Sequence, residues 1–203
     1  MSALRVVLAS RNEGKLRELT ALLGDFGFTL ESQAAHDVPS PVEDGLTFVE
    51  NALIKARAVA AATSLPAIAD DSGLVVPALQ GAPGIYSARY AGTHGDDLAN
   101  NAKLVAELAN ASDRRAYFYC AMCFIGHAED PTPLIATAAW HGEIVDEPRG
   151  EGGFGYDPHF RVAGRQETSA ELPRDEKNAL SHRGQACAAL ADMLRDWLDR
   201  QGV

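Results

Sequence analysis

The sequence predicts an α/β fold in a single domain, residues 1–203. In the first half, apolar runs typical of buried strands alternate with helical patterns, beginning with a run at residues 4–9 and an amphipathic segment at residues 16–26. From residue 117 onward the pattern is richer in strands. With 203 residues and 46% apolar content, the chain can bury one sizeable core or form one domain with two lobes.

Charge and composition narrow the functional class. A net charge of −10 argues against affinity from broad contact with a nucleic-acid backbone, but a free nucleotide in a cleft stays possible. The sequence has no run of about 18 apolar residues, so we expect no membrane span. The N-terminal residues lack the apolar core of a signal peptide, which favours a soluble cytoplasmic protein.

Two of the three cysteines, Cys120 and Cys123, form a C-x-x-C pair within a strand-like run. Residues three apart on a strand point to opposite faces, so these thiols should neither chelate one metal ion nor form an easy disulfide. We therefore expect buried cysteines in a protein of a reducing compartment.

A polar loop joins the first predicted strand to the first helix. The strand, residues 4–9, is almost continuously apolar and is expected to be central. Amides at the start of the following helix would favour an anion, although an ordinary capped helix explains the pattern equally well and the Walker A spacing is absent. The loop residues that could hold an anion are Ser10, Arg11, Asn12, Glu13, Gly14 and Lys15.

A capping box opens the second predicted helix. Residues 28–31 predict a short strand, and a Pro-rich connection containing Glu43 follows. Thr47 begins the capping box, and the helical pattern continues to about Thr63. Lys55 lies on a polar face of this helix, which is either functional or simply solvated.

Two adjacent carboxylates follow a buried run at residues 67–69. The run is expected to end a short strand at Asp70 and Asp71, where Gly73 permits a turn. Neighbouring carboxylates repel, so a divalent cation is a natural partner for them. Taken alone, the stretch is at least as typical of a surface turn.

The middle of the chain predicts a structured loop, a helix and a hairpin. Glycine and proline around two tyrosines and an arginine indicate the loop at residues 79–92. Residues 96–110 should form a helix. Residues 117–125 and 133–140 should form antiparallel strands, and residues 140–145 should continue the sheet. The apolar stripe expected on the helix is Leu98, Ala102, Val105 and Leu108.

A second glycine-rich stretch, residues 149–158, contains two aromatic side chains. Its glycines would let the backbone approach a ligand closely. The alternative is a long flexible hairpin. In such a hairpin the rings of Phe154 and Tyr156 would have no fixed contact to make. We therefore expect this stretch to contact a ligand.

The last helix is expected to begin with two cationic residues. Ser181 is a plausible N-cap, which places His182 and Arg183 in the first helical turn. Cations there oppose the helix dipole, so a bound anion or a polar base edge would explain them, whereas a surface pair is the plainer alternative. The expected apolar stripe is Cys187, Leu190, Leu194 and Trp197.

Five stretches together resemble the inosine triphosphate pyrophosphatase family. They are residues 8–15, 69–74, 81–90, 152–158 and 181–184, which occur in the family's order and extend over nearly the whole chain. As a set they are highly specific. In the first stretch Arg11 departs from the glycine that many members carry in a Thr-Gly-Asn triplet.

The resemblance implies an elongated central mixed sheet flanked by helices, with two lobes, an active-site cleft between them, and usually a homodimer. It also implies hydrolysis of ITP, dITP and XTP to the monophosphate and pyrophosphate with Mg²⁺. Such a reaction needs charge neutralised on the triphosphate and an activated water. Base selectivity would come from donors that meet the 6-carbonyl of hypoxanthine or xanthine, while Phe154 or Tyr156 stacks on the ring.

By position, the resemblance assigns catalysis to Asp71 and a metal site to Glu43, Asp70 and Asp71. Ser72 would lie beside the substrate, and Lys55 would join the loop of residues 10–15 in holding phosphates. The residues that would hold the base are Phe154, Gly155, Tyr156, Asp157, Lys177, His182 and Arg183.

Two other functions compete with this interpretation. The related Maf-like pyrophosphatases carry a Ser-Pro-Arg-Arg type segment in the first loop, which residues 10–13 do not match. A non-catalytic nucleotide sensor is the second alternative. Asp70 and Asp71 argue against it, because anion binding gains nothing from added carboxylates without a metal ion. Turnover measured with and without Mg²⁺ separates these possibilities.

Overall fold

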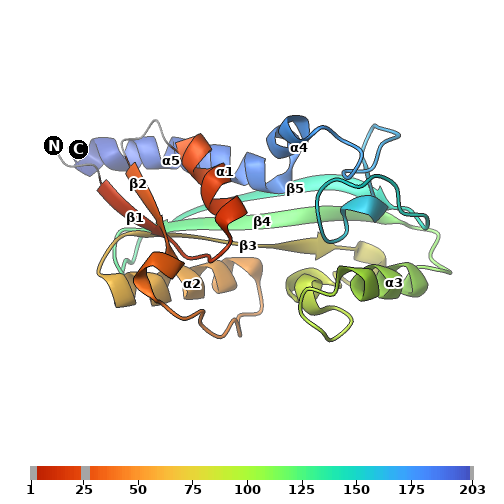
Figure 1. The fold of residues 1–203 in the computed structure, drawn as a ribbon, viewed down its shortest axis with the longest axis horizontal. Helices are drawn as coiled ribbons and strands as arrows, with labels where there is room; N and C mark the ends of the chain where they lie inside the picture. Colours follow the sequence, from red (N-terminus) through yellow and green to blue (C-terminus); the bar gives the residue numbers. More distant parts are fainter. Residues whose placement is uncertain (1–3, 24–27, 202–203) are drawn as a thin grey trace. The chain divides into compact units, whose positions relative to one another are not determined.

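The computed structural model describes residues 4–23 and 28–201 and shows an α/β fold with a mixed six-stranded sheet (Figure 1). The strand order is β2-β1-β3-β4-β5-β6. The strands are β1 (Leu4–Leu8), β2 (Phe28–Ser32), β3 (Ala67–Val75), β4 (Arg115–Ile125), β5 (Leu134–Ile144) and β6 (Phe160–Val162). The α-helices are α1 (Glu13–Leu23), α2 (Phe48–Thr63), α3 (Asp97–Glu107), α4 (Arg174–Leu180) and α5 (His182–Gln201).

Strand directions explain why the sheet is mixed. β1 is parallel to both β2 and β3, whereas β5 and β6 are antiparallel. β4 and β5 are neighbours whose contacts run in opposite directions along the two strands: Ile144 N–H donates to the Arg114 carbonyl, and the Phe118 and Trp140 rings meet further along. The predicted hairpin is therefore confirmed.

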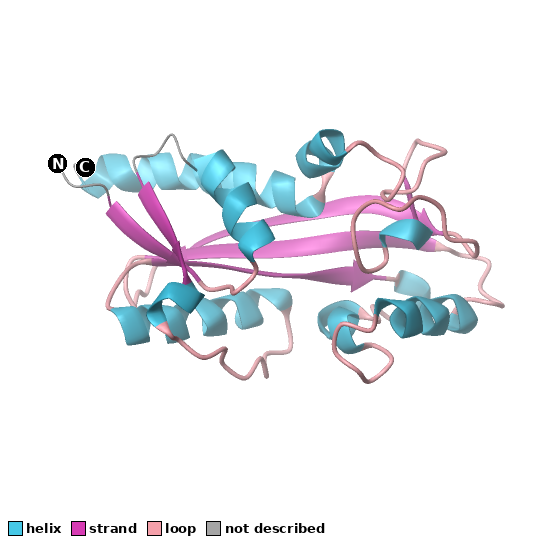
Figure 2. Cartoon of the chain, in the orientation of Figure 1, coloured by secondary structure: helices cyan, strands magenta, loops and turns pink. Residues whose placement is uncertain are grey.

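Short 3₁₀ turns connect several of these elements. The long connection between β5 and β6 is drawn mainly as loop (Figure 2). The turns are η2 (Gln33–His36), η3 (Pro77–Leu79), η4 (Gly84–Arg89) and η5 (Asp157–His159).

The chain divides into two compact units, each built from segments that are distant in sequence. The first unit contains Met1–Asp71, Ala121–Thr137 and Gln185–Val203, and the second contains Ser72–Cys120 and Ala138–Gly184. The division falls inside β3, β4 and β5. The sequence predicted one domain over residues 1–203, and that remains a prediction.

In the first unit, helices cover both faces of the sheet. α2 lies on one face, and α1 and α5 lie on the other (Figure 1). Small side chains of α2, including Ala52, Ala56 and Val59, are almost fully buried in a cluster with Val7 and Ala67 of the strands. Thr47 caps α2 as predicted, because its Oγ1 accepts the Glu50 N–H at 3.2 Å. Of the predicted α5 stripe, Cys187, Leu190 and Leu194 are buried, whereas Trp197 is half-buried and packs edge-on against Phe124 with ring centroids 4.8 Å apart.

In the second unit, three aromatic rings form the centre of the core. Phe118 of β4 packs against Phe160 of β6 at a ring distance of 4.6 Å, and Trp140 of β5 packs against Phe160 at 5.4 Å. Leu104 and Leu108 at the C-terminal end of α3 join the same cluster.

Two sequence predictions about secondary structure were wrong in detail. β3 does not end at the adjacent carboxylates but continues to Val75, because Leu74 supplies another fully buried apolar residue beyond them. The face of α3 also differs from the predicted stripe. Leu98 is 86% exposed, whereas Asn100 and Asn101 are buried. Polar contacts, not apolar ones, fix the first half of this helix.

The three cysteines are buried and free, and the predicted burial of Cys120 and Cys123 is confirmed. Burial raises the pKa of the Cys123 thiol to about 12. In the described part of the chain, no helix combines the length and apolar character needed to cross a membrane.

Candidate active site

Asp70 and Asp71 point to opposite faces of β3, because successive side chains of a strand alternate. Asp70 accepts both hydrogen bonds of an ion pair with Lys15 of α1, at 2.9 and 2.8 Å. Asp71 accepts from Lys55 of α2 at 2.8 Å. Since α1 and α2 cover opposite faces of the sheet (Figure 1), the two neighbouring carboxylates have separate cationic partners.

Lys55 bridges two carboxylates that come from different segments. Its Nζ lies 2.8 Å from Asp71 Oδ1 and 3.1 Å from Glu43 Oε2, and its side chain is 13% exposed. Burial alone would lower the pKa of Lys55, but the Asp71 carboxylate outweighs that effect and the pKa is raised. Burial raises the pKa of Asp71, and Lys55 offsets this only in part. Asp71 is thus a stronger proton acceptor than an exposed aspartate.

The three predicted metal ligands, Glu43, Asp70 and Asp71, lie on different sides of β3. Asp70 points to the opposite face of β3 from Asp71, and its side chain is only 1% exposed and pairs with Lys15. Within residues 4–23 and 28–201, no three His, Cys, Asp or Glu side chains gather closely enough to hold a metal ion by themselves. Glu43 and Asp71 do converge, on Lys55. Two carboxylates suit Mg²⁺, which commonly completes its shell with water and substrate phosphate oxygens.

The polar loop before α1 has the form of a helix cap. Ser10 Oγ accepts the Asn12 N–H at 3.1 Å, and Asn12 Oδ1 accepts the Lys15 N–H at 3.2 Å. Arg11 donates to the Val38 carbonyl at 3.0 Å, so its guanidinium ties the loop to a neighbouring segment. Glu13 and Gly14 begin α1, but their side-chain environment lies outside the described residues.

Within the second unit, the glycine-rich loop displays one aromatic ring. Phe154 is 66% exposed, which is unusual for a phenylalanine. Two cations lie over its ring: Lys177 Nζ at 5.4 Å and the Arg183 guanidinium carbon at 5.8 Å from the centroid. An exposed aromatic ring of this kind can stack on another flat group.

Asp157 holds this loop in shape. Its Oδ2 accepts the Phe154 N–H at 2.8 Å and pairs with Lys177, while its Oδ1 accepts from Ser169 Oγ at 2.6 Å. A glycine is needed at Gly153, where φ is +79° and an added Cβ would collide with Asp157 and Lys177. Asp157 and Lys177, two of the predicted base-binding residues, are therefore in direct contact.

Tyr156 does not have the environment that stacking requires. It is 4% exposed, lies in the aromatic core, and donates its hydroxyl to the Ser87 carbonyl at 2.8 Å. The structure therefore leaves Phe154 as the stacking candidate of the loop. Burial raises the pKa of Tyr156, so the phenol stays protonated.

The start of α5 is tied to residues of the same unit. Ser181 caps the helix by accepting the Gly184 N–H at 3.1 Å, as predicted. The His182 ring stacks on Phe118, with centroids 5.0 Å apart and planes 11° apart. Arg183 donates to Ser72 Oγ at 3.2 Å. Ser72 and Arg183 are thus brought together, while His182 is held against the core.

Sequence reasoning missed two residues of α3 that contact the aromatic loop. Asp97 Oδ2 accepts the Gly155 N–H, and Asn101 Nδ2 donates to the Gly155 carbonyl, both at 2.8 Å. The available signal was the polar Asn100-Asn101 pair inside a predicted amphipathic helix. The predicted apolar stripe of that helix does not include either residue.

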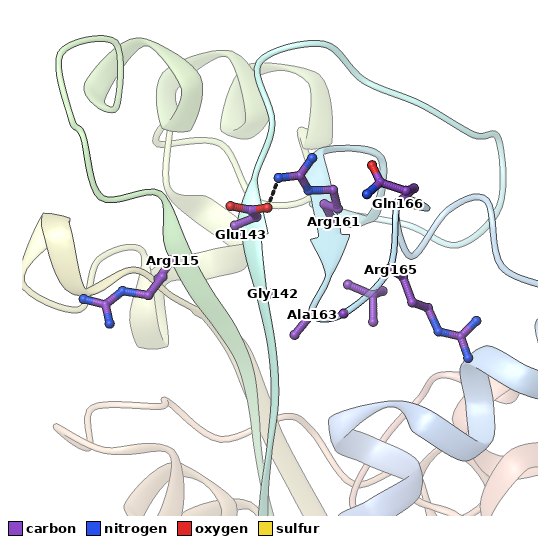
Figure 3. Close-up of a pocket in the computed structure, with 9 residues that line it drawn as sticks. Arg115, Gly142, Glu143, Arg161, Ala163, Arg165 and Gln166 are labelled. Atoms are coloured by element: carbon purple, nitrogen blue, oxygen red, sulfur yellow. Dashed lines mark hydrogen bonds and ion pairs between the residues drawn. The ribbon is translucent and has the colours of Figure 1, made fainter.

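A cavity of about 480 Å³ lies elsewhere in the second unit, beside β5 and β6 (Figure 3). None of its lining residues is a predicted site residue. Its arginines already have carboxylate partners: Arg161 pairs with Glu143, and Arg165 pairs with Glu176. The cavity is therefore not the candidate active site.

The sequence model of the Ham1 family matches residues 6–193, which is most of the chain and includes every predicted site residue. The chain belongs to the Ham1 family. This membership confirms the resemblance to the inosine triphosphate pyrophosphatases and not to the Maf-like enzymes.

The Ham1 relatives match over almost their whole length. A dITP/XTP pyrophosphatase from Shigella flexneri is 55% identical over 95% of this chain and 98% of its own. Another from Burkholderia pseudomallei is 56% identical over 94% and 93%. The solved Ham1 protein from Coxiella burnetii is 49% identical, has a TM-score of 0.92, and is matched over 95% of this chain and 99% of that one.

Proposed function

We propose that this chain hydrolyses ITP, dITP and XTP to the nucleoside monophosphate and pyrophosphate. Its Ham1 relatives named dITP/XTP pyrophosphatase support the substrate class. The observation that carries the chemistry is the group of Lys55, Glu43 and Asp71, which joins a cation and two convergent carboxylates, one of which, Asp71, has a raised pKa. A triphosphate-cleaving site needs these components.

Asp71 accepts a proton from the attacking water. The water oxygen bonds to the α-phosphorus as the bond from that phosphorus to the bridging oxygen of the β-phosphate breaks, which releases pyrophosphate. A general base works best when its pKa is near the working pH, and burial moves the pKa of Asp71 in that direction. Glu43, on the other side of Lys55, adds negative charge that favours the cationic form of the lysine.

Lys15 and Lys55 neutralise the phosphate oxygens. Each is paired with carboxylates of β3 or its surroundings, so substrate would exchange these partners for phosphates. The amides at the start of α1 add donors for the same group. Glu43 and Asp71 would hold Mg²⁺, which when bound supplies Lewis-acid stabilisation of the developing phosphate charge and a lowered water pKa.

We assign base binding to the second unit. Phe154 stacks on the purine, with Lys177 and Arg183 over the ring as cationic neighbours. Arg183 or a loop amide donates to the 6-carbonyl of hypoxanthine or xanthine. The 6-amine of adenine would face a donor instead, so ATP is a poor substrate.

We also propose a homodimer in the cytoplasm. Exposed apolar side chains are available in each unit, Val42 and Leu46 in the first and Leu98 in the second. Sedimentation equilibrium over a hundredfold range of protein concentration tests the dimer: a mass of one chain throughout would contradict it. Buried cysteines without disulfides suit a reducing compartment.

A nucleotide panel tests the function. ITP, dITP, XTP, ATP and GTP are each incubated with the chain, and both products are identified by chromatography. We expect monophosphate and pyrophosphate, with kcat/KM much higher for the three non-canonical nucleotides. Chelation by EDTA should abolish turnover, and Mg²⁺ should restore it. Turnover that survives EDTA would refute the metal assignment while leaving the substrate assignment intact.

A further inference from the structure

The first two turns of α3 hold both polar backbone groups of Gly155. Asp97 Oδ2 accepts its N–H at 2.8 Å, and Asn101 Nδ2 donates to its carbonyl at 2.8 Å. The two side chains are four residues apart, so they lie on one face of the helix. Asn101 Nδ2 also donates to the Asp97 carbonyl at 2.9 Å, which fixes its orientation.

The same loop is held at its other end by Asp157, which accepts the Phe154 N–H at 2.8 Å. The backbone is thus fixed immediately before and immediately after the Phe154 side chain. Gly155 itself has φ of +62°, and an added Cβ would meet nothing within 4 Å. Hydrogen bonds, not packing, therefore fix the loop at this residue.

These contacts explain why α3 carries a buried amide at Asn101, whereas the neighbouring Asn100 accepts the Ala91 N–H at 2.7 Å. Asn101 is 7% exposed, and among the described residues its Oδ1 has no hydrogen-bond partner. A buried amide is costly unless it is well bonded, so a purely structural helix would favour an apolar side chain here. Leu98, by contrast, is left 86% exposed on the same helix.

We propose that Asp97 and Asn101 are positioning residues for base recognition. They hold the Gly155 backbone and thereby keep the exposed Phe154 ring in the orientation that receives the purine. Fixing a binding loop in its bound shape increases affinity by reducing the ordering cost of binding. The inference rests on the proposed function, and it assigns to these residues no contact with the phosphates.

Two variants of Asp97 separate positioning from direct contact. Asp97→Ala removes the acceptor for the Gly155 N–H, whereas Asp97→Asn keeps an acceptor oxygen and removes only the charge. We expect KM for ITP to rise roughly tenfold in Asp97→Ala with kcat changed less than about threefold, and Asp97→Asn to restore most of the loss. Equal defects in the two variants would overturn the proposal in favour of a charge effect.

A product-inhibition measurement separates loop positioning from general damage. The inhibition constant of IMP, which carries the base, should weaken roughly tenfold in Asp97→Ala and Asn101→Ala, while that of pyrophosphate stays unchanged. Asn110→Ala, at an exposed position beyond the end of α3, serves as the control. Equal weakening of IMP and pyrophosphate would contradict the proposal.

Amide hydrogen exchange tests the contact without relying on activity. The Gly155 amide should exchange faster in Asp97→Ala than in the unmodified chain and be protected again in Asp97→Asn. Absence of ITP turnover in the unmodified chain would defeat the proposed function, whereas unchanged Gly155 exchange would defeat the positioning role alone. If Asn101→Ala does not fold, the Asp97 pair still decides the question, because Asp97 is exposed.

Discussion

The ammonium group of Lys55 donates to Asp71 Oδ1 over 2.8 Å, so the carboxylate proposed to be catalytic has a largely buried cation as its direct neighbour. Glu43 approaches the same ammonium from another segment. The arrangement predicts that Asp71 can be neutralised without loss of the fold, because Lys55 keeps one carboxylate partner.

Asp71→Asn should lower kcat for ITP by about 100-fold or more, since it removes a proton acceptor and a proposed metal ligand. The substitution is nearly isosteric, so the melting temperature should change by only a few degrees. Steady-state kinetics and thermal melting measure both effects. Asp44→Asn, at an exposed neighbour of Glu43, is the matched control and should keep normal activity. Near-normal turnover in folded Asp71→Asn would refute the assigned role.

The Lys15–Asp70 ion pair should respond asymmetrically to mutation. Asp70 is 1% exposed, whereas Lys15 is 23% exposed and can turn toward water. Lys15→Met leaves the buried carboxylate without this lysine and should destabilise the fold by about 3–5 kcal/mol, and Asp70→Asn should cost clearly less. Urea unfolding measures both free energies. The double variant should recover much of the Lys15→Met loss, and equal costs for the two single variants would contradict this account.

The sequence indicated which charged residues of the first unit are candidates for the site, but it did not indicate to which face of the sheet each side chain points. The candidates included Lys15, Lys55, Asp70 and Asp71. Because a turn was expected directly after residue 71, the alternation of side chains along a strand was not applied to the two aspartates. Once β3 is seen to continue to Val75, period-two geometry alone places them on opposite faces. The strand's continuation depends on a core that local sequence does not show.

Base selectivity should depend on Arg183 more than on Phe154. Stacking is insensitive to ring substituents, so Phe154→Ala should weaken ITP and ATP alike by roughly 1–3 kcal/mol. Arg183→Ala should instead reduce kcat/KM for ITP and XTP far more than for ATP. Kinetic constants of both variants on the three nucleotides decide this. An equal loss on all three in Arg183→Ala would make Arg183 a phosphate or structural group.

The aromatic loop shows where local sequence is insufficient. Phe154 and Tyr156 are equivalent in the sequence pattern, yet Tyr156 is buried by contact with Ser87, which lies 69 residues earlier. The contacts of Asp97 and Asn101 with Gly155 span 58 and 54 residues. Long-range contacts of this kind cannot be derived from helical periodicity.

The buried thiols predict a loss of stability at alkaline pH. In the folded chain the pKa of Cys123 is about 12, against 9.0 for the ordinary thiol. Between these values the unfolded chain has lost the proton and the folded chain has not, so the free energy of unfolding should fall as pH rises from about 9 to 12. Below pH 9 this contribution is constant. In Cys123→Ala the free energy of unfolding, measured in urea, should decline less steeply with pH, and an equal slope would contradict the assignment.

The burial of the thiols also predicts slow chemical modification. At pH 8, thiol alkylation should occur only as fast as the chain unfolds.

Attack of water on the α-phosphorus is the central claim, and isotope transfer tests it most directly. ITP is hydrolysed by the chain in H₂¹⁸O, and the products are examined by ³¹P NMR and mass spectrometry. The account predicts one ¹⁸O atom in the phosphoryl group of IMP and none in pyrophosphate. Label in pyrophosphate, or release of IDP with labelled orthophosphate, would contradict it.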